Sequence, residues 1–219
     1  MSKTIDIMGT PFALLPERAL LLPAQKTLVV ADWHLGKAAH FRKAGIFMPS
    51  VLHDKDTTRL QSLLDGYPIR TVVFLGDLFH SDLNSEWLAF EQFRSANTTV
   101  RFVLTRGNHD ILPDNLLKKN AIEVFVSYPV APHIVCTHHP MEHVAAGLIN
   151  IAGHVHPGCL IPTKGRQTYR LPCFYHYRQT LILPAFGALT GVHLLQPLRD
   201  ANIYPIAGNE VWKWIPTER

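Results

Sequence analysis

The sequence predicts an α/β protein in which two β-sheets form a sandwich with helices on the outside. Short runs of β-branched and aliphatic residues recur along the chain, and longer stretches with helical character separate the first three. Continuous apolar runs of this length suit buried strands, and strand–helix alternation is typical of an α/β core. The 219 residues, 47% hydrophobic and 17% charged, fit a globular chain. We therefore interpret residues 1–219 as one domain.

The elements follow in order from these patterns. The expected core strands are the apolar runs at 27–31, 71–75, 100–104, 133–136 and 148–152. Apolar residues at mixed helical spacing predict helices over 50–64 and 84–95. After residue 150 the runs 158–162, 179–183 and 191–195 are divided by proline and glycine, which indicates a second, more antiparallel sheet. The early segments 4–8 and 19–22 are expected to pair with that second sheet.

Composition excludes several classes of protein. The three cysteines have no C-x-x-C spacing, so we expect reduced core thiols in a cytoplasmic protein and no disulfide framework. No stretch approaches the ~20 apolar residues that a membrane span needs, and the first residues make a poor signal peptide. A formal charge of +4 is compatible with a phosphate-bearing polymer as partner, although many basic proteins bind none.

Polar motifs directly follow the predicted core strands, and they contain many of the 13 histidines. They are Asp32-Trp33-His34, Gly76-Asp77-Leu78-Phe79-His80, Gly107-Asn108-His109-Asp110, His138-His139-Pro140 and Gly153-His154-Val155-His156. The carboxyl ends of neighbouring strands converge on one crevice, so these residues can meet there. In D-x-H and H-x-H an extended backbone would point both side chains to the same side.

The donors in these motifs are oxygen and imidazole, with no thiolate. Such a set suits two divalent ions of intermediate hardness, such as manganese, iron or zinc, rather than calcium. Two ions ~3.5–4 Å apart need a shared anionic ligand, for which Asp77 is the natural candidate. Each motif alone has a commonplace explanation as surface or core residues. Their order, each at a strand end, makes chance a poor explanation.

The ordered set D-x-H, G-D-x-x-H, G-N-H-D, H-H-P and G-H-x-H resembles the calcineurin-like metallophosphoesterase superfamily. This resemblance implies a four-layer α/β/β/α sandwich with two divalent metal ions, Mn²⁺ foremost and Fe, Zn or Mg as alternatives. It implies one metal at Asp32, His34, Asp77 and His156, and a second at Asp77, Asn108, His138 and His154. The family ligand in H-H-P directly follows the strand, which favours His138, but the choice between His138 and His139 stays open.

A narrower resemblance involves runs outside the metal motifs. Residues 31–37, 41–45, Pro49, 170–174 and 183–188 are similar to the bacterial ligase-associated DNA-damage-response endonucleases of the PdeM type. This implies a DNA endonuclease or phosphodiesterase that functions in repair beside a ligase, a helicase and a second nuclease. A small-molecule phosphatase or a cyclic-nucleotide phosphodiesterase is the alternative. A non-catalytic scaffold is disfavoured because every ligand position is filled.

The family mechanism assigns further roles. A hydroxide bridging the two metals would attack phosphorus, and the Asn108 amide would stabilise charge on the phosphoryl oxygens. His109 would be the general acid towards the leaving oxygen, and Asp110 would hold its imidazole in the right tautomer. We expect substrate contacts from residues near the motifs, namely His80, His139, Arg42, Lys43 and Arg106. The sequence leaves oligomeric state and strand preference open.

Overall fold

The first sheet contains the predicted strands that carry the first three motifs. The computed structural model describes residues 1–37, 45, 51–79, 85–163 and 167–215. The sheet has seven strands in sequence order, antiparallel from β1 to β4 and parallel from β4 to β7. They are β1 (Lys3–Ile7), β2 (Thr10–Leu15), β3 (Ala19–Leu22), β4 (Thr27–Val30), β5 (Thr71–Phe74), β6 (Arg101–Thr105) and β7 (Ile122–Phe125).

The pairing predicted for the N-terminal segments is wrong. Segments 4–8 and 19–22 correspond to β1 and β3, and both belong to the first sheet, joined through β2. Met8 and Gly9 have φ values of 55° and 80°, which a two-residue hairpin turn of type I′ requires. A short connection brings neighbouring strands together at a small entropy cost. The strands β1, β2, β3 and β4 accordingly pair in the order of the sequence.

The second sheet is mixed, and its strands come from the second half of the chain. Its order is β14, β11, β12, β13, β10, β9 and β8, with β15 paired to β12 and β16 paired to β15. The strands are β8 (Ser127–Ala131), β9 (Ile134–Thr137), β10 (Ile149–Ala152), β11 (Pro157–Pro162), β12 (Thr168–Tyr177), β13 (Thr180–Ile182), β14 (His193–Leu194), β15 (Asn202–Ala207) and β16 (Glu210–Val211). Strands β9, β10 and β13 run parallel, whereas β11 and β12 form a hairpin.

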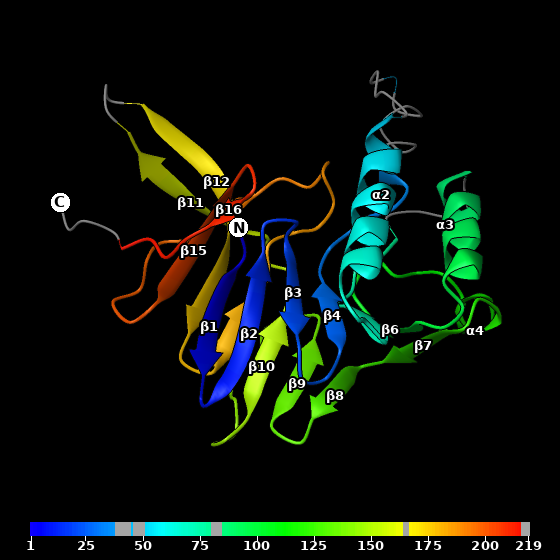
Figure 1. Cartoon of the computed structure of the whole chain (residues 1–219), viewed down its shortest axis with the longest axis horizontal. Coiled ribbons are helices and arrows are strands. Elements are labelled where there is room, and N and C mark those ends of the chain that lie inside the picture. Colours follow the sequence, from blue (N-terminus) through cyan, green and yellow to red (C-terminus); the bar gives the residue numbers. More distant parts are fainter. Residues whose placement is uncertain (38–44, 46–50, 80–84, 164–166, 216–219) are drawn as a thin grey trace.

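The described helices are α2 (Val51–Gly66), α3 (Ser85–Ala96) and α4 (Asp114–Lys119). Helices α2 and α3 lie beside the first sheet (Figure 1) and bury Leu60, Trp87 and Phe90 in a core cluster with Phe74. The described part of the chain beyond residue 119 contains no helix. There the outer face of the second sheet packs against residues of loops, Trp214 among them. None of the described helices is long and apolar enough to cross a membrane.

A second core cluster lies between the two sheets. Val29 from β4 and Val73 from β5 pack there with Ile151 from β10 and Phe174 from β12. Their strand neighbours, such as Val30, face the helices instead. Burial on both faces explains why these strands are continuous apolar runs. The two-sheet α/β sandwich that the sequence predicts is therefore confirmed. It places the carboxyl ends of the parallel strands β4 to β7 against those of the parallel strands β9, β10 and β13.

Candidate metal centre

The candidate ligands come from strand ends in both sheets. Asp32 follows β4, Asp77 follows β5 and Asn108 follows β6 in the first sheet. His138 follows β9, and His154 follows β10, in the second sheet. The crevice expected at one sheet edge is therefore formed by the facing edges of two sheets.

Asp32, His34 and His156 form one group of donors. One ligand atom from each of these residues lies within 4.8 Å of the others. Asp32 is fully buried, and its Oδ1 lies 3.4 Å from Nε2 of His156. His34 Nε2 also lies 3.9 Å from Oδ2 of Asp77. These are the residues that the family resemblance assigns to the first metal.

A second group surrounds Nε2 of His138. This nitrogen lies 3.1 Å from Asn108 Oδ1, 3.1 Å from His154 Nδ1 and 3.7 Å from Asp77 Oδ1. Two nitrogen ligands of one ion lie roughly 3 Å apart, because each metal–nitrogen bond is about 2.1 Å long. Asp77 thus presents Oδ1 to the second group and Oδ2 to His34 of the first, as a shared carboxylate should.

The buried groups of the centre fit divalent cations. Asp32 and Asp77 are 0% and 2% exposed, and their ion pairs within the described structure are with histidines alone. Two buried carboxylates without a lysine or arginine partner need another source of positive charge. The buried Nε2 of His156 makes no hydrogen bond within the described structure. The residues present therefore match the cations that the resemblance implies.

The tautomer of His138 and the pKa of His154 also suit the binding of a metal ion. His138 Nδ1 lies 2.8 Å from the carbonyl oxygen of Leu75, which can only accept, so Nδ1 is the donor in this bond, and the neutral tautomer that makes it has its lone pair on Nε2. This arrangement favours His138 over His139 as the motif ligand. Burial, and then the neighbouring His139 and His138, lower the pKa of His154. His154 is thereby biased towards the neutral form that a metal requires.

The backbone of the ligand motifs is left-handed, which corrects the extended conformation expected for D-x-H and H-x-H. Positive φ values between 48° and 66° occur at Asp32, His34, Asp77, His154 and His156. Non-glycine residues rarely adopt this region, and such strain persists where the surrounding structure imposes it. Hydrogen bonds fix these turns, including His34 N to Asp77 O at 2.9 Å and His154 N to Asp32 Oδ2 at 2.9 Å.

Glycines make room for the ligand side chains. A Cβ added at Gly76 would overlap the imidazole of His138, and Gly76 itself has a φ of 72°. A Cβ at Gly107 would overlap the Asp77 carboxylate. Each position therefore requires glycine because the side chain of a candidate ligand occupies the space beside its Cα.

The G-N-H-D motif lies at the exposed edge of the centre. Asn108 and His109 are exposed, and the backbone N–H of His109 donates to Oδ1 of Asp77 at 2.9 Å. This bond holds His109 beside both donor groups, with its ring centroid 5.5 Å from that of His34.

Asp110 is placed differently from our expectation. It is buried, and its carboxylate accepts backbone N–H groups of Leu78 and Phe79 at Oδ1 and of Gly107 at Oδ2, at 2.8 to 3.2 Å. The bond to the His109 imidazole that we expected is absent from the described structure. Burial raises the pKa of Asp110. Three amides from two loops satisfy this carboxylate locally, so Asp110 ties those loops together.

The expected substrate contacts separate into three groups. His80, Arg42 and Lys43 lie outside the described residues. Arg106 donates to the carbonyl of Asp110 and forms an ion pair with Asp114, so its guanidinium braces the loop after β6. His139 is exposed beside the second donor group, with its ring 4.0 Å from that of His154.

Asn150 is a site residue that our sequence analysis did not identify. It is fully buried in β10, and its side chain hydrogen-bonds Thr137 Oγ1 at 2.8 Å and Met141 N at 3.0 Å. It therefore anchors the loop that carries His138 and His139. The signal for it was an amide residue inside an otherwise apolar strand, which needs buried partners.

The fold and this centre together define a metal-dependent phosphoesterase. A sequence model of the calcineurin-like phosphoesterase family matches residues 25–158, which is more than half of the chain. The chain belongs to the calcineurin-like phosphoesterase family.

Solved structures provide a second comparison. The nuclease MPE of Pseudomonas putida is 30% identical, with a TM-score of 0.81 over 98% of this chain and 100% of that chain. A protein of unknown function from Aquifex aeolicus is 19% identical, with a TM-score of 0.44 over 59% of this chain and 78% of that chain. None of the curated proteins compared with the chain matches it.

Proposed function

We propose that the chain is a nuclease that hydrolyses phosphodiester bonds of DNA in a repair setting, with two divalent cations. The observation that carries this proposal is the position of Asp77, whose two oxygens face different donor groups. Similarity to the Pseudomonas putida nuclease over the whole of both chains supports a nucleic-acid substrate. The repair setting, and association with a ligase, a helicase and a second nuclease, rest on the narrower sequence resemblance.

The donor set favours manganese. Carboxylate and amide oxygens suit Mn²⁺ and Mg²⁺, whereas imidazoles suit Fe and Zn. Mn²⁺ accepts both kinds of ligand, so we propose it as the native ion, with Fe, Zn and Mg as alternatives. When bound, a pair of divalent ions lowers the pKa of a coordinated water and neutralises charge on a phosphoryl group.

The residues of the chain supply orientation and a proton. The amide of Asn108 lies at the exposed edge beside the second donor group, where it can orient a phosphoryl oxygen. His109 is exposed on the same turn, anchored through its backbone to Asp77. Its imidazole donates a proton to the leaving oxygen as the phosphorus–oxygen bond breaks. Asp110 supports this step by holding the turn, through the amide of Gly107.

The deciding experiment compares substrate classes with Mn²⁺ present. The substrates are single- and double-stranded DNA, bis-p-nitrophenyl phosphate, its mono-ester and 2′,3′-cyclic nucleotides. Asp77→Ala is the inactive variant, and Asp200→Ala, which changes an exposed carboxylate, is the matched control. We expect cleavage of DNA and of the diester that Asp77→Ala abolishes and Asp200→Ala retains. Turnover of mono-ester or cyclic nucleotide with intact DNA would instead identify a small-molecule enzyme.

A further inference from the structure

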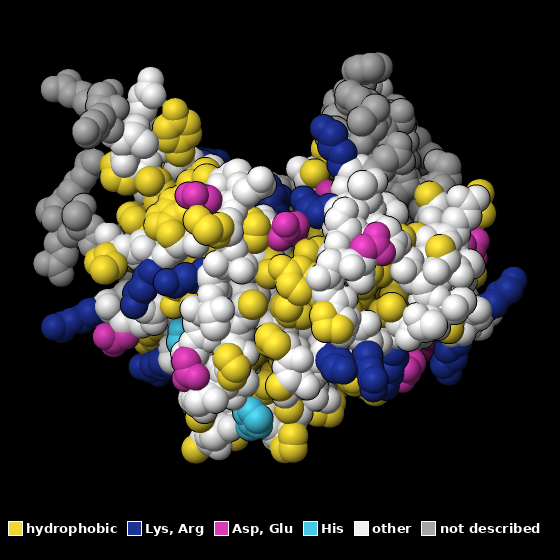
Figure 2. Space-filling model, in the orientation of Figure 1, with side chains coloured by type: hydrophobic (Ala, Val, Ile, Leu, Met, Phe, Trp, Pro, Cys, Tyr) yellow, Lys and Arg dark blue, Asp and Glu magenta, His cyan; other side chains and the backbone are white. Residues whose placement is uncertain are grey.

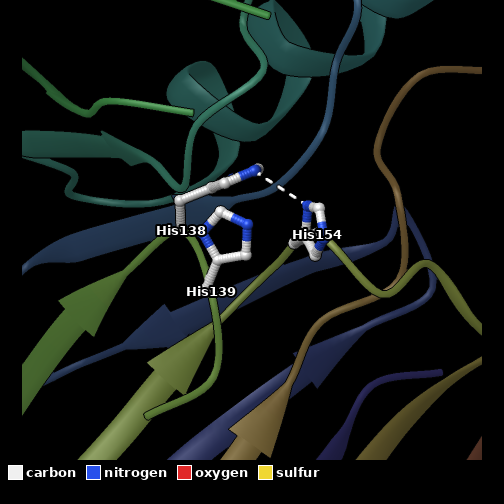
Figure 3. A group of neighbouring side chains, drawn as sticks. All are labelled: His138, His139 and His154. Carbon is white, nitrogen blue, oxygen red and sulfur yellow. Dashed lines mark hydrogen bonds between the residues drawn. The ribbon is translucent and has the colours of Figure 1, made fainter. Parts of the chain in front are cut away.

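The imidazole of His139 lies against two residues of the second donor group. One ring nitrogen each from His138, His139 and His154 lies within 4.8 Å of the others. The His139 ring centroid is 4.6 Å from that of His138 and 4.0 Å from that of His154. Figure 3 shows the His139 ring between the other two, at the point where the loops after β9 and β10 meet. The family motif set assigns no role to this third imidazole.

A hydrogen-bonded chain from the core holds His139 in this position. Thr137 Oγ1 donates to the carbonyl oxygen of His139 at 2.7 Å, and Asn150 Nδ2 donates to the same Oγ1 at 2.8 Å. Asn150 Oδ1 also accepts the backbone N–H of Met141, two residues beyond His139. The loop is therefore fixed on both sides of His139 by one fully buried side chain. Groups that orient a ligand in this way are characteristic of metal sites.

We propose that His139 is an additional ligand of the cation held by His138 and His154, and that Thr137 and Asn150 are its positioning residues. This proposal concerns the metal centre and does not depend on the substrate. His139 is exposed, and its ring lies against those of His138 and His154.

A third imidazole changes the metal preference of the second position. Imidazole nitrogen binds Zn²⁺, Co²⁺ and Ni²⁺ more strongly than Mn²⁺ or Mg²⁺, following the general order of divalent affinities. Removing one imidazole should therefore weaken the binding of Co²⁺ more than that of Mn²⁺. The first position, at Asp32, His34 and His156, forms a donor group that does not include His139, so it should keep its affinity.

The test is a calorimetric titration of the metal-free protein with Co²⁺ and, separately, with Mn²⁺. His139→Ala should weaken one of the two sites by at least about tenfold for Co²⁺, as loss of a group that supports a ligand already does. It should also alter the visible spectrum of the cobalt protein. The matched control is His143→Ala, an exposed histidine four residues along the chain. Unchanged cobalt affinity and spectrum in His139→Ala, or equal losses in both variants, would overturn the proposal.

The positioning role has a separate test. Thr137→Val removes the hydroxyl that bonds the His139 carbonyl, whereas Thr137→Ser keeps it. We expect weaker cobalt binding in the valine variant and wild-type binding in the serine variant. Thermal unfolding of the metal-free proteins measures any general loss of stability. Wild-type binding by the valine variant would contradict the positioning role.

Discussion

The imidazole of His138 donates its Nδ1 proton to the carbonyl oxygen of Leu75 at 2.8 Å. Leu75 is the residue after β5, in the first sheet, while His138 follows β9 in the second. This single bond therefore joins the two sheets at the metal centre. It also determines which nitrogen of His138 faces the other candidate ligands.

Gly76→Ala should disturb this arrangement directly. A Cβ at Gly76 would overlap the His138 ring, and the positive φ of 72° disfavours any side chain there. We expect metal affinity and turnover to fall by at least about tenfold, as when a supporting group is lost. The control is Gly191→Ala, because no atom lies within 4 Å of an added Cβ there. Metal titration and steady-state kinetics on the two variants make the comparison.

Asp77→Asn should impair both cation positions at once. The substitution removes the negative charge that two donor groups share, while the side chain keeps its size. We expect turnover to fall by about 10³-fold or more, because metal ions supply several kcal/mol of transition-state stabilisation. Metal content should fall below two ions per chain. A variant that retained both ions and full turnover would contradict the bridging role.

His109→Ala should discriminate between leaving groups. A general acid matters most when the leaving oxygen is strongly basic, so turnover of DNA or alkyl diesters should fall about 10²–10⁴-fold. Aryl substrates such as bis-p-nitrophenyl phosphate need little protonation and should lose much less. The ratio of the two losses, measured at saturating Mn²⁺, is the readout. Equal losses on both substrates would exclude His109 as the acid.

Asp110→Ala should lower the stability of the fold and not only the rate of catalysis. Asp110 is 3% exposed, and its removal leaves three backbone N–H groups without their acceptor. We expect the free energy of unfolding to fall by about 3 kcal/mol or more. The control, Asp114→Ala, removes a carboxylate that is 62% exposed and should cost at most about 1 kcal/mol. Urea unfolding of the metal-free variants measures both changes.

Removal of the cations should lower the melting temperature. Without them, the buried carboxylates of Asp32 and Asp77 are balanced only by histidines. Mn²⁺ at a hundred times its dissociation constant should add about 2.7 kcal/mol to the free energy of unfolding. Calorimetry with Mn²⁺ and with a chelator measures this difference, which should shrink in Asp77→Asn. An equal shift in that variant would show that the stabilising ion binds elsewhere.

Local sequence patterns were sufficient for the motifs and for the core strands that precede them, whereas β2, β7, β8, β12, β15 and β16 were not predicted. The core strands are continuous apolar runs because both of their faces are buried, as Val29 and Val30 illustrate. Each run ends where a ligand motif begins, and parallel strands place those ends at one edge of a sheet. The family resemblance then supplied the two candidate ligand sets, and the structure brings the residues of each set close together.

The tertiary structure decided which strands pair with one another and which groups the charged side chains contact. The sequence of the segments before β4 does not specify the sheet in which they pair. The turn at Met8 and Gly9 pairs β1 with β2, and the pairing of β3 with both β2 and β4 places them all in the first sheet. Arg106 was expected to contact the substrate and Asp110 to orient the His109 imidazole, because both flank the G-N-H motif. Their charges are engaged instead by Asp114 and by backbone amides that are distant in sequence.

By itself, the sequence determined the class of fold, the order of the candidate ligand motifs and the oxygen and imidazole donors that they offer to divalent ions, because these depend on local hydrophobicity and on the chemistry of each side chain. Only the tertiary structure decided that His138 rather than His139 turns its Nε2 towards Asp77, and that Asn150 anchors their loop. These features depend on hydrogen bonds between strands and loops distant in the chain, which form only when the two sheets pack together.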